Sequence, residues 1–194
     1  FESVPVLMLT GLDDDASITR AYEAGATDFF VKSTQWSLLA GRLRYLLRSA
    51  RTRQELERNK SRLARAQDAA ARTLAAWLQQ QPQVAQLLHP AFEGSPGHDH
   101  WRALCTEDGQ GGGDSLAAGL FSVVFDGRYS PAQVDAFCDA LRLFKLGYSW
   151  GGPVSLVVPY DVPSMRPHWP HAGVLVRFSI GLEDVQDLQA DLAA

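Results

Sequence analysis

Cysteine is scarce in this sequence: Cys105 and Cys138 are the only two among 194 residues. Their spacing is not that of a metal site, and they predict reduced thiols rather than a disulfide framework. No apolar run is long enough to cross a membrane, and we expect no signal peptide. A net positive charge is also lacking, since the formal charge is −4. We therefore expect a cytoplasmic protein that binds neither membranes nor nucleic acid.

The stretch from residue 36 to residue 81 lacks proline and has one glycine, Gly41. It predicts a single helix of unusual length, which Pro82 would end. Ten basic and three acidic residues lie between Arg42 and Arg72, a balance typical of a solvated helix face. Apolar residues also recur at seven-residue steps along the helix: Leu56, Leu63, Ala70 and Trp77. Lys60 and Gln67 interrupt this seam, which leaves the helix a weak candidate surface for a homodimer.

Two apolar segments flank a short predicted helix near the start of the chain. Residues 4–9 predict a buried strand, residues 16–24 a helix and residues 28–32 a second strand. This spacing predicts a parallel pair of strands, whose C-terminal ends carry functional groups in many α/β proteins. Thr10 and Lys32 lie at these two ends. The first residue is Phe1 rather than methionine, so we expect the chain to begin inside a larger fold.

This first part resembles the C-terminal part of a response-regulator receiver domain, through residues 4–11 and 21–32. In that family a hydroxyl and a lysine at these strand ends contact the aspartyl phosphate, so the resemblance makes Thr10 and Lys32 a phosphate-site remnant. Ser33 departs from the family, which usually has proline there. The phosphate-accepting aspartate and the Mg²⁺ ligands would precede Phe1, so we expect the Mg²⁺ site to be missing. The match covers residues 1–50, and the helix to about Gln67 is similar to the linkers of such domains.

Beyond Pro82 short apolar runs alternate with turns and helices. The sequence predicts strands at residues 84–89, 120–125, 146–149, 155–158 and 174–180, and helices at residues 100–104, 130–144 and 182–194. A glycine-rich loop is expected at residues 110–114. This order of elements favours an antiparallel sheet with helices on one face.

Arg177 lies in the middle of the last apolar strand. From the pattern alone, an arginine on the wet face of an edge strand is the commoner explanation. The alternative is an anion anchor, because arginine stays charged, is seldom buried unpaired and has a flat fork of donors that suits a carboxylate or phosphate.

The second part resembles the C-terminal domain of cystathionine β-lyase and related pyridoxal-phosphate enzymes of cysteine and methionine metabolism. The ordered matches lie at residues 74–78, 88–91, 96–98, 119–122, 143–156 and 175–184. In that family an arginine grips the α-carboxylate of the amino-acid substrate, and a Ser-Trp-Gly-Gly turn lines the substrate side of the cofactor. The resemblance therefore implies that Arg177, Ser149 and Trp150 are substrate-binding residues. Val154 stands where the lyases often have glutamate.

The catalytic groups of that family lie in a large N-terminal domain. Lys60 and Lys145, the only lysines after Lys32, match no catalytic position. We therefore expect no catalytic residue, no metal site and no bound pyridoxal phosphate in this chain, although the cofactor belongs to the parent family.

Taken together, the sequence predicts an α/β receiver-like (flavodoxin-like) fragment at residues 1–50, a long linker helix at residues 51–81 and an α+β domain of the aspartate aminotransferase type at residues 82–194. The leading hypothesis is the substrate-carboxylate-binding domain of a C–S lyase, without independent activity. The alternative is a signalling remnant that acts as a dimerisation or interaction module. The join near residues 67–71 has three candidate origins: a gene rearrangement or assembly artefact, an engineered recombinant, and a natural regulatory protein that lost both active sites.

Overall fold

The computed structural model describes residues 4–11, 14–32, 36–105, 116–166 and 168–194. The predicted loop at residues 110–114 lies outside them. The chain divides into two compact units, Phe1–Ser61 and Arg62–Ala194. Helix α2, Trp36–Gln79, starts in the first unit and ends in the second.

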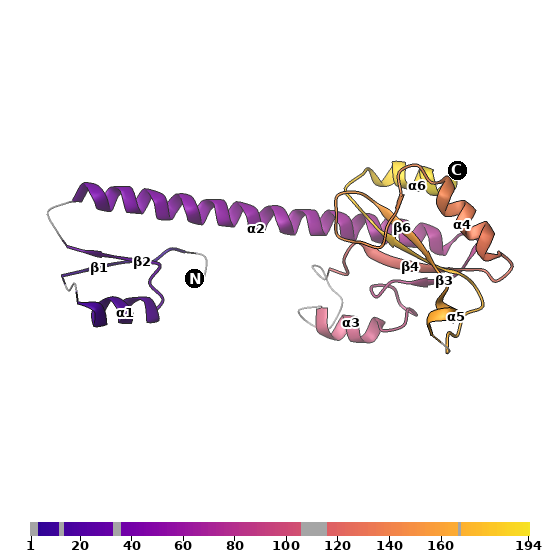
Figure 1. Cartoon of the computed structure of the whole chain (residues 1–194), viewed down its shortest axis with the longest axis horizontal. Helices are drawn as coiled ribbons and strands as arrows, with labels where there is room; N and C mark the ends of the chain where they lie inside the picture. Colours follow the sequence, from indigo (N-terminus) through magenta and orange to yellow (C-terminus); the bar gives the residue numbers. More distant parts are fainter. Residues whose placement is uncertain (1–3, 12–13, 33–35, 106–115, 167) are drawn as a thin grey trace. The chain divides into compact units, whose positions relative to one another are not determined.

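The first unit is a small parallel β–α–β element. Strands β1 (Leu7–Thr10) and β2 (Asp28–Val31) pair in parallel, which confirms the predicted pairing, and α1 (Asp15–Glu23) connects them (Figure 1). Asp14 caps the start of α1, since its carboxylate accepts a hydrogen bond from the Ser17 N–H at 2.9 Å. The hydrogen bonds from Ser17 lower the pKa of the Asp14 carboxyl.

Few apolar side chains are buried in this unit. Among its described residues, Ala21 and Phe30 are the buried hydrophobic ones, whereas Met8 and Leu9 of β1 are exposed. The prediction that β1 is a fully buried strand is therefore wrong. A parallel strand is buried when other elements cover both its faces. Here β1 pairs only with β2 among the described residues of the unit.

The second unit contains a five-stranded sheet in the order β3-β4-β7-β6-β5. The strands are β3 (Val84–Leu88), β4 (Leu120–Phe125), β5 (Lys145–Leu146), β6 (Leu156–Tyr160) and β7 (Leu175–Ser179). Three neighbouring pairs are antiparallel, as predicted, but β5 and β6 are parallel. Residues 147–155 therefore return the chain to the starting end of β5 instead of forming a hairpin, since parallel neighbours run in the same direction.

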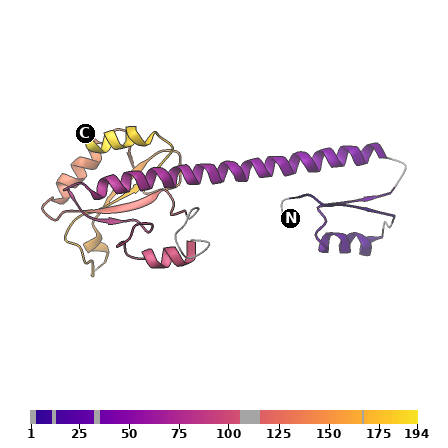
Figure 2. The ribbon, with the colours of Figure 1, turned by 180° about the vertical axis from the view of Figure 1, so that it is seen from behind.

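Four further helices complete the second unit: α3 (His98–Cys105), α4 (Pro131–Ala140), α5 (Val162–Met165) and α6 (Val185–Ala193). Helix α4 begins with a capping box between Ser130 and Gln133 and ends before the predicted residue 144, because Leu141 has an extended backbone. The end of α2, α4 and α6 pack on one face of the sheet. Helices α3 and α5 lie toward the other side (Figures 1 and 2), so the prediction of helices on one face is wrong for α3, the helix expected at residues 100–104.

The main core lies between the sheet and these three helices. Its members on α2, α4 and α6 are Ala71, Leu74, Ala75, Leu78, Val134, Cys138, Leu188 and Leu192. On the central strands β4 and β7, Val123 and Phe178 face this core and are fully buried. Successive side chains of a strand point to opposite faces, so Arg177 and Ser179 lie on the other face. Strand β7 lies between β4 and β6, and the edge-strand interpretation of Arg177 is therefore wrong.

The seven-residue repeat of α2 does not form one continuous seam. Ala70 and Trp77 pack against the core of the second unit, whereas Leu56 and Leu63 are 53% and 48% exposed. Dimerisation through this helix stays a prediction. Within the described residues, no helix has both the length and the apolarity needed to span a membrane.

Candidate anion-binding site

Arg177 lies on the face of the sheet opposite the main core. In the sheet register it stands opposite Ser122 of β4 and Val158 of β6. The side chain is half-buried, and its Nη2 donates to the Ser149 carbonyl at 3.2 Å and more weakly to the Gly147 carbonyl at 3.5 Å. The structure thus brings together Arg177 and the Ser149 turn, which sequence reasoning assigned to one site.

Two aromatic rings flank the Arg177 guanidinium. Its Cζ lies 5.7 Å from the ring centre of Trp150 and 5.6 Å from that of Tyr160. Tyr148 in turn packs edge-on against Tyr160, with ring centres 6.0 Å apart. Cation–π contacts of this kind hold a guanidinium in place without neutralising its charge. Trp150 was predicted from the sequence, but Tyr160 was not.

The Arg177 guanidinium has an N–H donor that no described residue uses. Its Nε is buried and has no hydrogen-bond partner among the described residues. No described carboxylate lies within 4.0 Å of it as an ion-pair partner. Buried donors normally have partners, and a carboxylate can accept two parallel N–H donors from one arginine. The arrangement is therefore suited to binding a carboxylate or a similar anion.

Gln67 fixes the two segments that carry this site. Its side-chain amide donates to the Gly152 carbonyl at 2.8 Å and to the Ile180 carbonyl at 3.1 Å. One bond holds the turn that carries Trp150, and the other holds the end of β7 beyond Arg177. The sequence marked Gln67 only as an interruption of a weak seven-residue seam, and its hydrogen bonds within the second unit were missed.

A second polar group secures the same turn. Glu183 accepts hydrogen bonds from the backbone N–H and the hydroxyl of Ser155, both at 2.8 Å. The Ser155 oxygen accepts the Gly181 N–H at 2.9 Å. A Cβ at Gly181 would lie 2.4 Å from the Pro153 carbonyl oxygen, so a larger residue would break this arrangement. The sequence placed Glu183 near the end of the last matched segment, but it did not predict the hydrogen bonds of Glu183 with Ser155.

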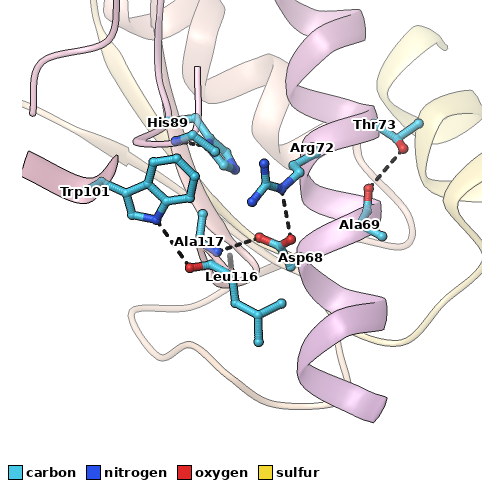
Figure 3. Close-up of polar contacts among 9 residues, drawn as sticks. Asp68, Ala69, Arg72, Thr73, His89, Trp101, Leu116 and Ala117 are labelled. Atoms are coloured by element: carbon cyan, nitrogen blue, oxygen red, sulfur yellow. Dashed lines mark hydrogen bonds and ion pairs between the residues drawn. The ribbon is translucent and has the colours of Figure 1, made fainter. Parts of the chain in front are cut away.

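A buried polar cluster lies between α2, α3 and the segment before β4 (Figure 3). Asp68 accepts from Arg72 Nε at 2.9 Å and from the Ala117 N–H at 2.8 Å. The Arg72 guanidinium lies 5.6 Å from the ring centre of Trp101, whose indole N–H donates to the Leu116 carbonyl at 3.3 Å. The cluster therefore ties α2 to α3 and to residues 116 and 117.

His89 is fully buried beside this cluster (Figure 3). Its Nδ1 accepts the Ala91 N–H at 3.1 Å, which assigns the ring proton to Nε2. Nε2 has no hydrogen-bond partner among the described residues. Burial, reinforced by the positive charge of Arg72, lowers the pKa of His89 to about 4. The ring is therefore neutral at physiological pH.

The cysteines do not belong to the anion site. Cys138 is buried on α4, and burial raises the pKa of its thiol to about 12. Cys105 is exposed at the end of α3. In the part of the chain that the structure describes, histidine, cysteine and acidic side chains form no group that could hold a metal.

Thr10 and Lys32 meet in the first unit. Thr10 ends β1, and the Lys32 N–H donates to its carbonyl at 2.7 Å. The structure therefore places both residues at the C-terminal ends of the parallel strands, as predicted. Their role as a phosphate-site remnant stays a prediction.

The residues around Arg177 do not fit covalent attachment of pyridoxal phosphate, which requires a lysine. The chain has three lysines. Lys32 belongs to the first unit, as does Lys60, which pairs with Glu57 at 2.9 Å. Lys145 is exposed and donates to the Arg142 carbonyl. Within the second unit, Lys145 is therefore bound elsewhere and is not a partner of the residues around Arg177.

Comparison with known proteins identifies relatives of the second unit and of part of α2. The family of Cys/Met metabolism PLP-dependent enzymes matches residues 48–194, a span that starts well before the expected boundary near residue 70. Cystathionine beta-lyase of Salmonella typhimurium is 42% identical over 126 residues, which cover 62% of this chain and 30% of the lyase. The L-alanine/L-glutamate racemase of Wolbachia pipientis is 32% identical over 124 residues, with 62% and 28% covered.

A solved structure shows the same fold. Apo CalE6, a methionine gamma lyase from Micromonospora echinospora, is 30% identical, with a TM-score of 0.53 over 67% of this chain and 32% of that one. The chain thus spans about a third of the length of these relatives.

Proposed function

The chain belongs to the family of Cys/Met metabolism PLP-dependent enzymes, and on this premise we propose that its second unit is the substrate-carboxylate-binding domain of a cystathionine β-lyase-like enzyme. Such an enzyme breaks a carbon–sulfur bond of an amino acid by β-elimination. One observation carries the proposal: Arg177 is half-buried, lies beside the turn of Ser149 and Trp150, and keeps its Nε without a partner among the described residues.

The named substrates of the relatives support a role in carboxylate recognition. Cystathionine, methionine, alanine and glutamate differ in their side chains but share an α-amino group and an α-carboxylate. The segment that these lyases and the racemase have in common is therefore suited to binding the α-amino and α-carboxylate groups that their substrates share. A guanidinium whose Nε has no partner among the described residues is suited to that carboxylate.

Carboxylate binding can be measured directly on the whole chain. L-Methionine, titrated into ¹⁵N-labelled protein, should shift the Arg177 Nε–H resonance in NMR spectra. Arg177→Gln should weaken the affinity at least tenfold, because charge-assisted hydrogen bonds contribute about 1.5–3 kcal/mol. Arg142→Gln, at an exposed position of the same unit, is the matched control and should bind normally. Equal affinity in both variants would contradict the proposal.

We also propose that the chain has no lyase activity by itself, because Lys145, the lysine of the second unit, is bound to the Arg142 carbonyl and is not beside Arg177. The large domain of the parent family would supply the cofactor lysine. Incubation with pyridoxal phosphate and cystathionine should release no pyruvate, and turnover at enzymatic rates would show the proposal to be wrong.

A second candidate function is a signalling or interaction module that dimerises through α2. The exposed side chains of Leu56 and Leu63 favour it, as does the position of Thr10 and Lys32 at adjoining strand ends. Sedimentation analysis should then show a dimer that Leu56→Lys disrupts. A strict monomer at high protein concentration would count against this function.

A further inference from the structure

An exposed apolar seam runs along the first half of α2, within the first unit. Its members are spaced alternately by four and three residues, as on a helix that meets another helix: Trp36, Ala40, Leu43, Leu47 and Ala50. Trp36, Leu43 and Leu47 are 56%, 41% and 49% exposed. The β–α–β element is contacted instead by Arg42, which donates to the Phe29 carbonyl at 2.8 Å. The seam is therefore left open to a partner.

Arginines follow one side of this seam at seven-residue steps. Arg44, Arg51 and Arg58 stand at the position beside the seam that faces the flank of a partner helix in a coiled coil. All three are exposed, and none has an ion-pair partner among the described residues. Arg48 follows Arg44 by four residues and precedes Arg51 by three, so these like charges repel one another along the helix. An acidic partner would remove this repulsion.

A second copy of this chain does not fit the seam. Antiparallel copies would set these arginines against one another, and parallel copies would set Arg53 against Arg58. Like charges across a contact select against that pairing. The seam is also separate from the surface that contains Leu56, because Leu56 follows Leu47 by about two and a half turns and lies on the opposite side of α2.

We propose that the seam docks an acidic amphipathic helix of a partner protein. Apolar side chains of that helix cover Leu43 and Leu47, and its carboxylates pair with Arg44 and Arg51. Charge complementarity selects this partner, and the spacing selects a helix. Seven residues correspond to about 10.5 Å along α2, the repeat at which a neighbouring helix presents its own flanking side chains. This interaction surface is independent of the carboxylate role of Arg177.

Two synthetic peptides test the charge of the partner. Both are four-heptad helices with leucine at the two seam positions, and they carry either glutamate or lysine at both flanking positions. Each is titrated into the full ¹⁵N-labelled chain, with the Trp36 indole N–H resonance as the readout. The glutamate peptide should bind about tenfold more tightly, and added NaCl should reduce this preference. Equal affinity for the two peptides would refute the proposal.

Two charge reversals three residues apart test the register. Arg51→Glu should weaken binding of the glutamate peptide about fivefold, because an attraction becomes a repulsion. Arg48→Glu makes the same change at an exposed position outside the flank and should alter the affinity by less than about twofold. Lysine at the one peptide position that faces residue 51 should restore binding to Arg51→Glu. Equal losses in the two variants would reveal a general attraction for polyanions and overturn the docked helix.

A pair of leucines tests the apolar seam. Leu47 and Leu56 are 49% and 53% exposed on the same helix. Leu47→Asn should weaken binding of the glutamate peptide about tenfold, because a buried apolar contact is lost. Leu56→Asn is the matched control and should bind normally, with circular dichroism confirming the helix content of both variants. Three results would contradict the proposal: equal binding by both variants, a dimer of the chain alone that Leu47→Asn disrupts, or tighter binding of duplex DNA or phosphatidylserine vesicles at the Trp36 readout.

Discussion

The two units of this chain are built from similar elements but differ in how much apolar surface they bury. In Phe1–Ser61 the buried hydrophobic side chains among the described residues are Ala21 and Phe30. In Arg62–Ala194 a continuous cluster joins a five-stranded sheet to three helices. Small assemblies of two strands are marginal in water, whereas a sheet with a covered face supports an independent fold. The stabilising hydrophobic core and the anion site therefore both lie in the second unit.

Removing a large core side chain should show this difference most strongly. Phe178→Ala should lower the free energy of unfolding of the second unit by about 3–5 kcal/mol, because the ring is fully buried against Phe121 and Phe144. Phe30→Ala is the counterpart in the first unit and should leave that transition unchanged. Urea unfolding followed by tryptophan fluorescence measures both, and an equal loss in the two variants would break the comparison.

Acidification should act on the two units in different pH ranges. Burial lowers the pKa of His89 to about 4, below its unfolded value, so the unfolded state takes up the proton first. The second unit should therefore lose stability as the pH falls from about 6.5 to 4, by up to about 3 kcal/mol. His89→Asn should flatten this slope in urea unfolding series.

Asp14 in the first unit has a lowered pKa, so the stability it adds should vanish only below its unfolded value of 3.8. A slope between pH 6.5 and 4 that persists in His89→Asn would contradict the assignment to His89.

Ion pairs on α2 provide a matched test. Asp68 is 6% exposed and bonds both Arg72 and the Ala117 N–H. Glu57 forms an exposed pair with Lys60 in the first unit. Asp68→Asn should cost about 2 kcal/mol, because Arg72 and a backbone donor lose a charged partner. Glu57→Gln should change the unfolding free energy by less than about 0.5 kcal/mol. If Asp68→Asn costs as little as Glu57→Gln, the buried cluster adds no stability.

Among the substitutions expected to destabilise the second unit, Gln67→Ala should have the smallest effect on stability and a larger effect on binding. It should cost about 1 kcal/mol, since two carbonyls lose their donor. It should also weaken L-methionine binding several-fold by loosening the turn of Trp150. Gln79→Ala, at an exposed position of the same helix, should alter neither property. A Gln67 variant with normal affinity would show that this amide does not position the site.

The elements that could be predicted from the sequence are those set by residues close together in the chain, such as strands and helix starts. The apolar run at residues 120–125 predicted strand β4, and helix α4 begins at Pro131, where the helix of residues 130–144 was expected. The resemblance brought Arg177 together with Ser149 and Trp150, which the structure places in contact.

Other features depend on partners far away in the chain. Gln67 bonds carbonyls 85 and 113 residues later, and no periodicity reveals such pairs. The parallel pairing of β5 with β6 was missed because β5 has only two residues and the route of residues 147–155 is set by Glu183 and Ser155. Tyr160 stands at the end of β6, where only the fold places it near Arg177.

Hydrogen exchange of the intact chain, with and without L-methionine, tests the central claim most directly. Peptides from residues 1–35 should exchange before those from β4 and β7. L-Methionine should slow exchange around residues 147–152 and 175–180 and leave residues 1–35 unchanged. Equal protection of both units, or an L-methionine effect confined to the first unit, would contradict the assignment of stability and carboxylate binding to Arg62–Ala194.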